Sequence, residues 1–150
     1  MKNSTLVLIG SEFNDYAREV MSLDERLAGQ YPEGRVVFIE KLERSLTLAA
    51  YSACDIFLLA SKAETQPIVL LEAMAAGIPF VSTDTGCVSE LPGGIVACNE
   101  AALSAALAER HDNEAKRREL GDLGRKAVLE SFTREKVVDA YAALIEELVS

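Results

Sequence analysis

Short, continuously apolar runs alternate along the first part of the chain with longer stretches that have helical spacing. The runs do not alternate apolar with polar residues, which is typical of strands covered on both faces of a parallel sheet. Alternating strands and helices therefore predict an α/β fold, a Rossmann-like parallel sheet with helices on both faces. The expected strands are Thr5–Ile9, Arg35–Glu40, Asp55–Ser61, Ile78–Thr83 and Gly93–Cys98.

Helices are expected between the strands and over the C-terminal third of the chain. Within that third, Gly121 and Gly124 are expected weak points, and Ser131 or Thr133 is expected to cap the last helix. The 150 residues contain no internal repeat or linker, so residues 1–150 are predicted to form a single domain. The expected helices are Phe13–Gly29, Leu42–Ala53, Ile68–Ala76, Glu100–Glu109, Asn113–Glu130 and Thr133–Val149.

The composition, 49% hydrophobic and 26% charged residues, is that of a soluble globular protein. The net charge of −9 argues against binding of nucleic acid or of an anionic membrane by charge alone. It leaves room for a small anionic ligand at a helix N-terminus. No apolar run is long enough to span a membrane, and the N-terminus lacks the layout of a signal peptide. A cytoplasmic location is therefore expected.

Residues suited to metal binding or nucleophilic catalysis are few. The three cysteines, Cys54, Cys87 and Cys98, have no CxxC spacing, so buried, reduced thiols are expected instead of a disulfide or metal site. His111, the only histidine, lies in a polar run and is expected on a solvated helix surface. Without a histidine cluster, neither a zinc site nor a Ser-His-Asp hydrolase is predicted.

The segment Ser61–Phe80, SKAETQPIVLLEAMAAGIPF, is expected to place a helix N-terminus just after the third predicted strand. Pro67 suits the first position of a helix, with Thr65 or Gln66 at or near the cap, and Gly77 ends the helix. Ligands of open parallel sheets bind at this edge. The free N–H groups and the positive end of the helix dipole make the N-terminus a candidate anion site.

Two glutamates with seven residues between them flank this helix end. The positions three and four residues from Glu72 are all apolar, so no Lys or Arg is placed to pair with it along the helix. Burying an unpaired carboxylate is costly, and a donor such as a sugar hydroxyl would offset that cost. Glu64 precedes the helix, and Lys62 is the only Lys or Arg between Arg44 and Arg110. The spacing of the two carboxylates suits a ligand that joins a sugar, a diphosphate and a ribose.

Each of these three residues also has an ordinary interpretation. Glu72 reaches solvent if its helix edge is exposed, Glu64 is a solvated loop charge, and Lys62 is a surface lysine. The spacing by itself leaves both interpretations open for each residue, so none of the three decides the function when it is taken alone.

The run ACDIFLLASKAETQPIVLLEAMAAGIPFVSTDTGCVSELPGG resembles the donor-binding domain of the retaining, GT-B-fold glycosyltransferases of family 4. The resemblance is carried by the two spaced glutamates, by the Ala-Met-Ala after the second one, and by the Gly-x-Pro that enters the next strand. STLVLIG, GRVVFIEKL and RREL…GRKAVLESFTREKVVDAY resemble further segments of the family, so nearly the whole chain is covered. The resemblance implies the second domain of a GT-B fold.

The resemblance also implies a role for each candidate residue. Glu64 would be the catalytic glutamate, which contacts hydroxyls of the donor sugar near the reacting carbon, and Glu72 would bind the ribose hydroxyls. Backbone N–H groups around Gln66 would hold the distal phosphate, and the loop Glu40–Leu42 would lie beside the base. No cofactor and no metal ligand are expected. The donor-binding set is Glu72, Thr65, Gln66, Ile68, Val69, Lys62, Glu40, Lys41, Leu42 and Gly10.

The sequence departs from the family pattern at two places. Where Gly-Phe-Gly or a similar segment commonly follows the first glutamate, this chain has Thr65, Gln66 and Pro67. Glycines permit close approach of the backbone to a ligand and Pro67 removes one N–H, so the phosphate contacts stay open. In the later loop, Gly86 is kept but Cys87 stands where a second glycine is frequent.

Complete enzymes of this kind have two Rossmann-like domains, and the chain resembles only the second. We therefore expect the donor-binding half of a hexosyltransferase-type enzyme, which moves a sugar from a nucleotide-diphosphate sugar to a glycan or lipid-linked acceptor. The N-terminal acceptor domain is expected to be absent from this chain, so the chain alone is expected to bind donor weakly and to be inactive. Any peripheral membrane contact would be made by the absent half, and polysaccharide biosynthesis is the expected setting.

Two other classes of function were compared with this one. The alternative is a non-catalytic α/β nucleotide-binding or interaction module that kept the fold, and the two departures favour it. Retention of both Glu64 and Glu72 speaks against it. A dehydrogenase-type dinucleotide domain is disfavoured, because Gly10 is followed by SEFNDY instead of completing a G-x-G-x-x-G motif.

Overall fold

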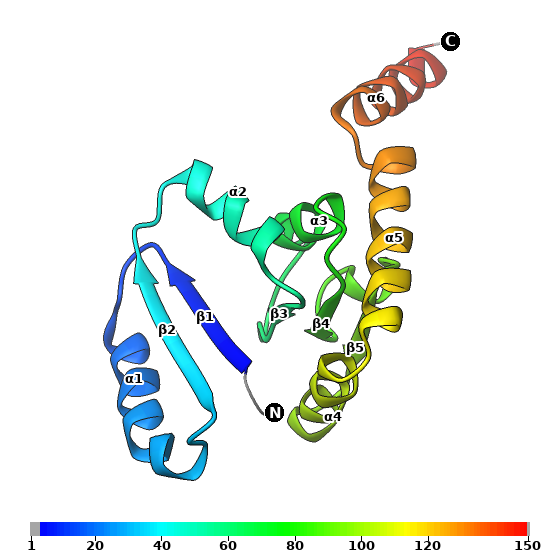
Figure 1. Cartoon of the computed structure of the whole chain (residues 1–150). Helices are drawn as coiled ribbons and strands as arrows, with labels where there is room; N and C mark the ends of the chain where they lie inside the picture. Colours follow the sequence, from blue (N-terminus) through cyan, green and yellow to red (C-terminus); the bar gives the residue numbers. More distant parts are fainter. Residues whose placement is uncertain (1–3, 150) are drawn as a thin grey trace. The chain divides into compact units, whose positions relative to one another are not determined.

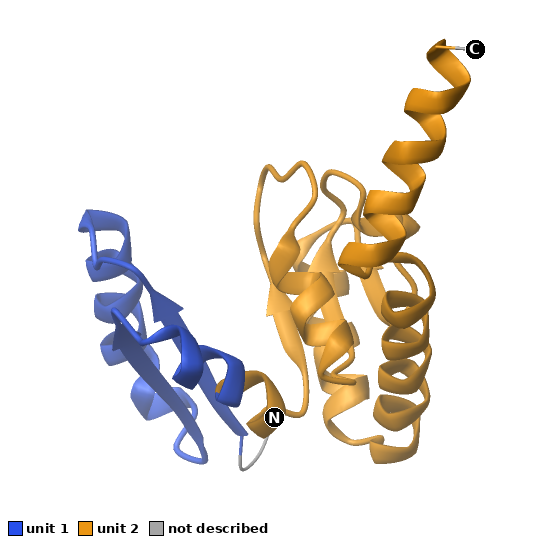
Figure 2. Cartoon of the chain, turned by 90° about the horizontal axis from the view of Figure 1, so that it is seen from above, with its two compact units in different colours: residues 1–49 blue, residues 50–150 orange. Residues whose placement is uncertain are grey.

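Residues 4–149 are described by a computed structural model, in which the chain divides into two units, Met1–Ala49 and Ala50–Ser150 (Figure 2). Each unit contains its own parallel sheet, of two strands in the first and of three in the second. The chain passes from one unit to the other within helix α2 (Arg44–Ala53). The predicted α/β class, with parallel strands and flanking helices, is confirmed. That the 150 residues form a single domain stays a prediction.

The first unit is a β-α-β arrangement. Strand β1 (Ser4–Gly10) pairs in parallel with β2 (Gly34–Glu40) along the full length of both strands. Helix α1 (Asp15–Leu27) and the short 3-10 helix η1 (Ala28–Gln30) connect the strands, and α1 lies beside the pair (Figure 1). The helix begins after Asn14, whose side chain caps it by accepting a hydrogen bond from a backbone N–H at 3.0 Å.

The second unit contains three parallel strands in the order β3-β4-β5, so β4 is the central strand. Its strands are β3 (Phe57–Leu59), β4 (Phe80–Thr83) and β5 (Gly94–Ala97), and its helices are α3 (Ile68–Ala75), the 3-10 helix η2 (Val88–Glu90), α4 (Glu100–His111), α5 (Glu114–Ser131) and α6 (Arg134–Val149). The core of this unit forms where α3, β4, η2 and α5 meet. Its buried cluster consists of Leu70, Met74, Phe80, Val88, Leu91 and Val128.

All the predicted strands and helices are present, with shifted ends. The largest difference is β3, which is three residues long, Phe57–Leu59, where Asp55–Ser61 is expected. The residues that follow Leu59 leave the strand early, because they begin the loop that leads to α3. Strand pairing within each unit gives the orders β1-β2 and β3-β4-β5.

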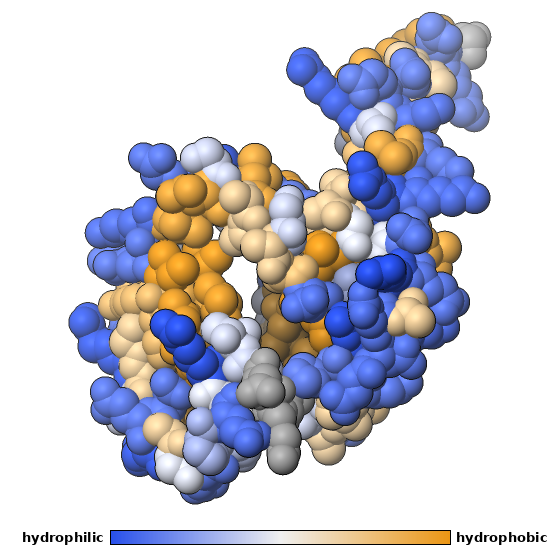
Figure 3. Space-filling view, in the orientation of Figure 1, coloured by the Kyte–Doolittle hydropathy of each residue, from blue (hydrophilic) through white to orange (hydrophobic). Residues whose placement is uncertain are grey.

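Helix α6 lies outside the core. None of its residues is buried, and in Figure 1 it extends from the end of α5. The predicted cap at Thr133 is confirmed, because its Oγ1 accepts a hydrogen bond from the Lys136 N–H at 3.3 Å. Among residues 4–149, no helix has both the length and the apolarity needed to cross a membrane. Apolar side chains on the surface of α6 (Figure 3) include Val137, Val138, Tyr141, Leu144, Ile145, Leu148 and Val149.

Two glycines of α5 are close-packing positions, so the prediction that they are weak points was wrong. Helix α5 is continuous through Gly121 and Gly124, and both are buried. A Cβ at Gly121 would lie 2.0 Å from the Gly77 carbonyl oxygen, and a Cβ at Gly93 would lie 2.6 Å from the Gly124 Cα. Backbone meets backbone at both points. Helix propensity alone does not register such a contact, which fixes the C-terminal end of α3 against α5.

Gly121→Ala is expected to destabilise the chain, because the added Cβ collides with a backbone carbonyl that cannot rotate away. Overpacking of this kind costs about 1–3 kcal/mol of unfolding free energy. Urea unfolding followed by circular dichroism measures it. Gly29→Ala is the matched control, because a Cβ there meets no heavy atom within 4 Å. Equal stability of Gly121→Ala and the unmutated chain would contradict the close crossing.

Candidate functional site

The loop between β3 and α3 carries four of the predicted site residues. It follows the C-terminal end of β3, the edge at which parallel sheets bind ligands. Glu64 is half-buried in this loop, whereas Lys62, Thr65 and Gln66 are exposed. Within this loop, one carboxylate is therefore sheltered from solvent and three other polar side chains face it.

The N-terminus of α3 has no side-chain cap. The sequence predicts Pro67 at the first helical position. In the structure Pro67 is the N-cap residue, with φ −73° and ψ 102°, so the helix begins one residue later. Its carbonyl oxygen accepts a hydrogen bond from the Leu70 N–H at 3.0 Å. The first helical residues, Ile68 and Val69, are 67% and 38% exposed. Uncapped N–H groups and the positive end of the helix dipole at a solvent-facing N-terminus suit an anion.

Glu72 lies in the middle of α3 and is half-buried. It also takes part in an interaction within the chain, so it is not the isolated charge that its apolar sequence neighbours predict. Spacing along a helix tests only the positions three and four residues away, and other contacts escape it. The protein thus already accommodates this carboxylate in an otherwise apolar helix.

The loop that carries Glu64 is attached to β4 and to the turn that follows it. Thr83 Oγ1 donates a hydrogen bond to the Ser61 carbonyl oxygen at 2.6 Å, and the Cys87 N–H donates to the Thr65 carbonyl oxygen at 3.1 Å. Gly86 has φ +56°, and a Cβ there would lie 2.3 Å from the Thr65 carbonyl oxygen. Both the left-handed backbone and the close approach require glycine at this position.

Sequence reasoning missed Thr83 and gave Gly86 no physical role. The hydrogen bond from Thr83 joins residues 22 positions apart, so no local pattern reports it. A signal did exist for Gly86, because a glycine a few residues after a strand often marks a turn with positive φ.

The remaining predicted residues come together in the first unit. The Lys41 N–H donates to the Gly10 carbonyl oxygen at 2.9 Å, and Lys41 has φ +53°, which is uncommon for a residue other than glycine. Glu40 Oε1 accepts a hydrogen bond from the Phe13 N–H at 2.8 Å, so this carboxylate fixes the start of the segment leading to α1. A hollow of about 340 Å³ lies here, lined by Ile9, Gly10, Ser11, Lys41, Leu42 and Thr47.

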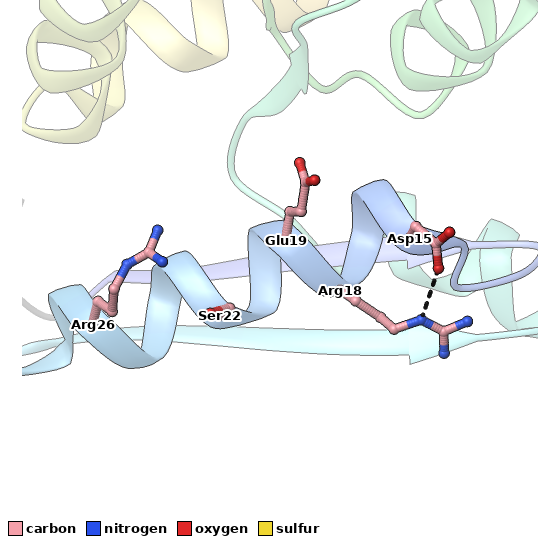
Figure 4. A pocket seen from close by; sticks show the side chains of 5 residues that line it. All are labelled: Asp15, Arg18, Glu19, Ser22 and Arg26. Carbon is pink, nitrogen blue, oxygen red and sulfur yellow. Dashed lines mark ion pairs between the residues drawn. The ribbon is translucent and has the colours of Figure 1, made fainter.

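The predicted site residues therefore form two groups, one in each unit. Another hollow, of about 520 Å³, contains none of them and runs along α1 (Figure 4). All the residues that line it come from this helix, Asp15 and Arg18 form an ion pair at 3.5 Å, and Glu19 points away from Arg18. This hollow is the surface of a single helix, with its charges paired or directed to solvent. It therefore does not enclose a ligand-binding or catalytic site.

The cysteines and the histidine differ in burial from the prediction. All three thiols are free, but Cys54 and Cys87 are only half-buried and Cys98 is exposed. Burial, and secondarily the Asp55 carboxylate, raises the pKa of the Cys54 thiol above its ordinary value. His111 is half-buried, with its Nδ1 2.6 Å from a carboxylate oxygen of the next residue. Among residues 4–149, no group of three or more His, Cys, Asp or Glu is placed to hold a metal ion.

The chain is similar in sequence to a known family and to a curated protein. Residues 1–113 match the model of the family Glycosyl transferases group 1. The chain is also 32% identical over 123 residues to N-acetyl-alpha-D-glucosaminyl L-malate synthase of Bacillus anthracis, a match that covers 78% of this chain and 32% of that protein. The chain thus spans about a third of the length of this curated relative.

Solved structures give the same fold. Sucrose-phosphate synthase of Thermosynechococcus elongatus superposes with a TM-score of 0.80 at 22% identity, over 96% of this chain and 38% of that one. HepE of Anabaena, in complex with UDP, superposes with a TM-score of 0.77 at 18% identity, over 96% of this chain and 41% of that one. The fold is therefore that of GT-B glycosyltransferases, and because the family model covers most of the sequence, the chain belongs to the Glycosyl transferases group 1 family.

Proposed function

We propose that the chain is the donor-binding half of a retaining glycosyltransferase of family 4, which takes a hexose from a nucleotide-diphosphate sugar. The observation that carries the proposal is the uncapped N-terminus of α3, with the half-buried Glu64 just before it and the half-buried Glu72 one to two turns into it. The similarity to HepE structures in complex with UDP and with UDP-glucose supports a donor of this kind.

Each part of a nucleotide sugar has a chemically suitable group in the chain. The N–H groups of Ile68 and Val69 suit the distal phosphate, because they lie at the N-terminus of α3, the positive end of the helix dipole. Glu72 is assigned to the ribose hydroxyls and Glu64 to the hydroxyls of the sugar, since carboxylates accept charge-assisted hydrogen bonds from such donors. The loop residues Glu40–Leu42, with Gly10, are assigned to the base, beside the hollow in the first unit.

The Glu40 carboxylate contributes to this arrangement through the backbone. Its hydrogen bond to the Phe13 N–H fixes the chain just after β1, and the Lys41 N–H bonds to the last residue of the same strand. The hollow is therefore lined by loop ends that are tied to each other. A planar base needs such a preformed surface more than it needs a charged partner.

The chemistry assigned to the chain is stabilisation of charge. When the sugar leaves the diphosphate, negative charge grows on the phosphate oxygens and positive charge on the sugar ring. The N-terminus of α3 stabilises the first, and Glu64 stabilises the second. No step in this assignment requires a metal ion. Transfer also needs an acceptor held against the reacting carbon of the sugar, so we expect no turnover by this chain alone.

Donor binding is the direct test of the proposal. Titrating the chain with UDP-, GDP- and ADP-glucose should shift the backbone amide signals of Ile68 and Val69, with dissociation constants of about 1 mM or lower. Two-dimensional NMR with nitrogen-15 labelling measures this, with uridine and glucose added separately as controls. An intact spectrum that responds to none of the three donors at millimolar concentration would favour the non-catalytic module instead.

Glu72→Gln is expected to weaken nucleotide binding, because the amide cannot accept two charge-assisted hydrogen bonds from ribose. Hydrogen bonds to a charged group contribute about 1.5–3 kcal/mol, which corresponds to a loss of affinity for UDP of about tenfold to a hundredfold. Calorimetry on the chain measures it. Glu130→Gln is the matched control, because it makes the same charge change at the exposed end of α5. Equal affinities of the two variants would remove Glu72 from the site.

A further inference from the structure

The loop that carries Glu64 has no regular secondary structure of its own. From residue 60 to residue 67, none of its residues belongs to a helix or strand. Neither a strand ladder nor a helix therefore fixes the direction of Glu64. Contacts from neighbouring segments must do so, and two of them come from β4 and the turn after it.

Thr83 holds the loop on the N-terminal side of Glu64. Its Oγ1 donates to the Ser61 carbonyl oxygen at 2.6 Å, at the short end of the range for hydroxyl donors. The Leu59 carbonyl oxygen lies 3.5 Å from the same Oγ1, so Ser61 is the main acceptor. Thr83 is the last residue of β4, which pairs with a strand on each side. The hydroxyl is thus presented by the central strand of its sheet.

Gly86 and Cys87 hold the loop on the C-terminal side of Glu64. The Cys87 N–H donates to the Thr65 carbonyl oxygen at 3.1 Å. A Cβ at Gly86 would lie 2.3 Å from that oxygen and 2.7 Å from the Glu64 carbonyl oxygen. Because both atoms belong to the backbone of the loop, any larger residue at position 86 must push the loop itself.

We propose that Thr83 and Gly86 are positioning residues, which fix the loop from both sides of Glu64 so that its carboxylate meets the donor sugar. The inference rests on the proposed function, in which Glu64 contacts the sugar. Thr83 and Gly86 act through the loop backbone and touch no part of the donor in that assignment. Functional side chains need to be held to within about 0.5 Å, which an irregular loop achieves only through such contacts.

The test measures the affinity ratio, which is the affinity of the chain for UDP-glucose divided by its affinity for UDP. This ratio isolates the contribution of the sugar. Thr83→Val removes the hydroxyl and keeps the shape of the side chain. It is expected to lower this ratio on the order of tenfold. That is less than the loss of about a hundredfold that a 1 Å misplacement of a reacting group can cause. The affinity for UDP itself should stay constant, since α3 is expected to hold the phosphate.

Two further variants separate positioning from general structural damage. Thr83→Ser keeps the hydroxyl and is expected to restore the ratio of the unmutated chain. Thr133→Val removes a threonine hydroxyl at the cap of α6 and is expected to leave the ratio unchanged. Loss of affinity for UDP and UDP-glucose by the same factor in Thr83→Val would overturn the inference, because it indicates damage to the whole site.

A double-mutant cycle with Glu64→Gln shows whether Thr83 acts through Glu64. The doubly substituted chain should have the ratio of Glu64→Gln alone, and additive effects would overturn the inference. If Glu64→Gln leaves the ratio unchanged, Glu64 does not contact the sugar, and the proposed function fails at that residue. If Glu64→Gln lowers the ratio but Thr83→Val does not, the positioning inference fails and the proposed function stands.

Gly86→Ala and hydrogen exchange provide tests that do not depend on Thr83. Gly86→Ala is expected to shift the ratio in the same direction, with Gly29→Ala as the control. In the unmutated chain, UDP-glucose should slow exchange of the Cys87 amide more than UDP does, because the sugar immobilises Glu64 and the loop beside it. Equal slowing by the two ligands would contradict the inference even if both substituted chains failed to fold.

Discussion

The contact of backbone against backbone between α5 and its neighbours is the constraint on which the second unit depends. At Gly121 and Gly124, helix α5 approaches the Gly77 carbonyl and the Gly93 backbone with no side chain between them. This approach fixes the C-terminal end of α3 and the start of β5 together. The N-terminus of α3, on which the candidate site is built, is therefore directed by a contact at the opposite end of the same helix.

Helix α3 combines buried apolar residues with one charged residue, Glu72. Leu70 and Met74 of α3 lie in the core with Val128 of α5, and both are completely buried. Glu72 is half-buried between them in sequence, one residue after a partly buried leucine. The apolar side of α3 contributes to stability, while its N-terminal end has no side-chain cap and Glu72 is half-buried. One short helix thereby serves both the core and the candidate site.

Local sequence signals were sufficient for most of the fold and for part of the site. Gly77 and Pro79 mark the end of α3 and the entry to β4, and continuous apolar runs identify each strand, because these signals act within a few residues. Pro67 was misplaced by one position, since proline fits both the N-cap and the first turn. Features that depend on distant contacts were not accessible. The bond from Thr83 to Ser61 and the crossing at Gly121 both belong to this class.

The exposure of α6 has a consequence for how the chain melts. A helix of 16 residues without buried side chains gains little from tertiary packing and depends on its cap and its intrinsic propensity. Isolated helices of this length are marginal in water, and they lose structure gradually on heating. The core of the second unit should instead unfold cooperatively. Ellipticity would then decline with a sloping baseline before the main transition, and the slope would measure fraying of α6 and not weakness of the fold.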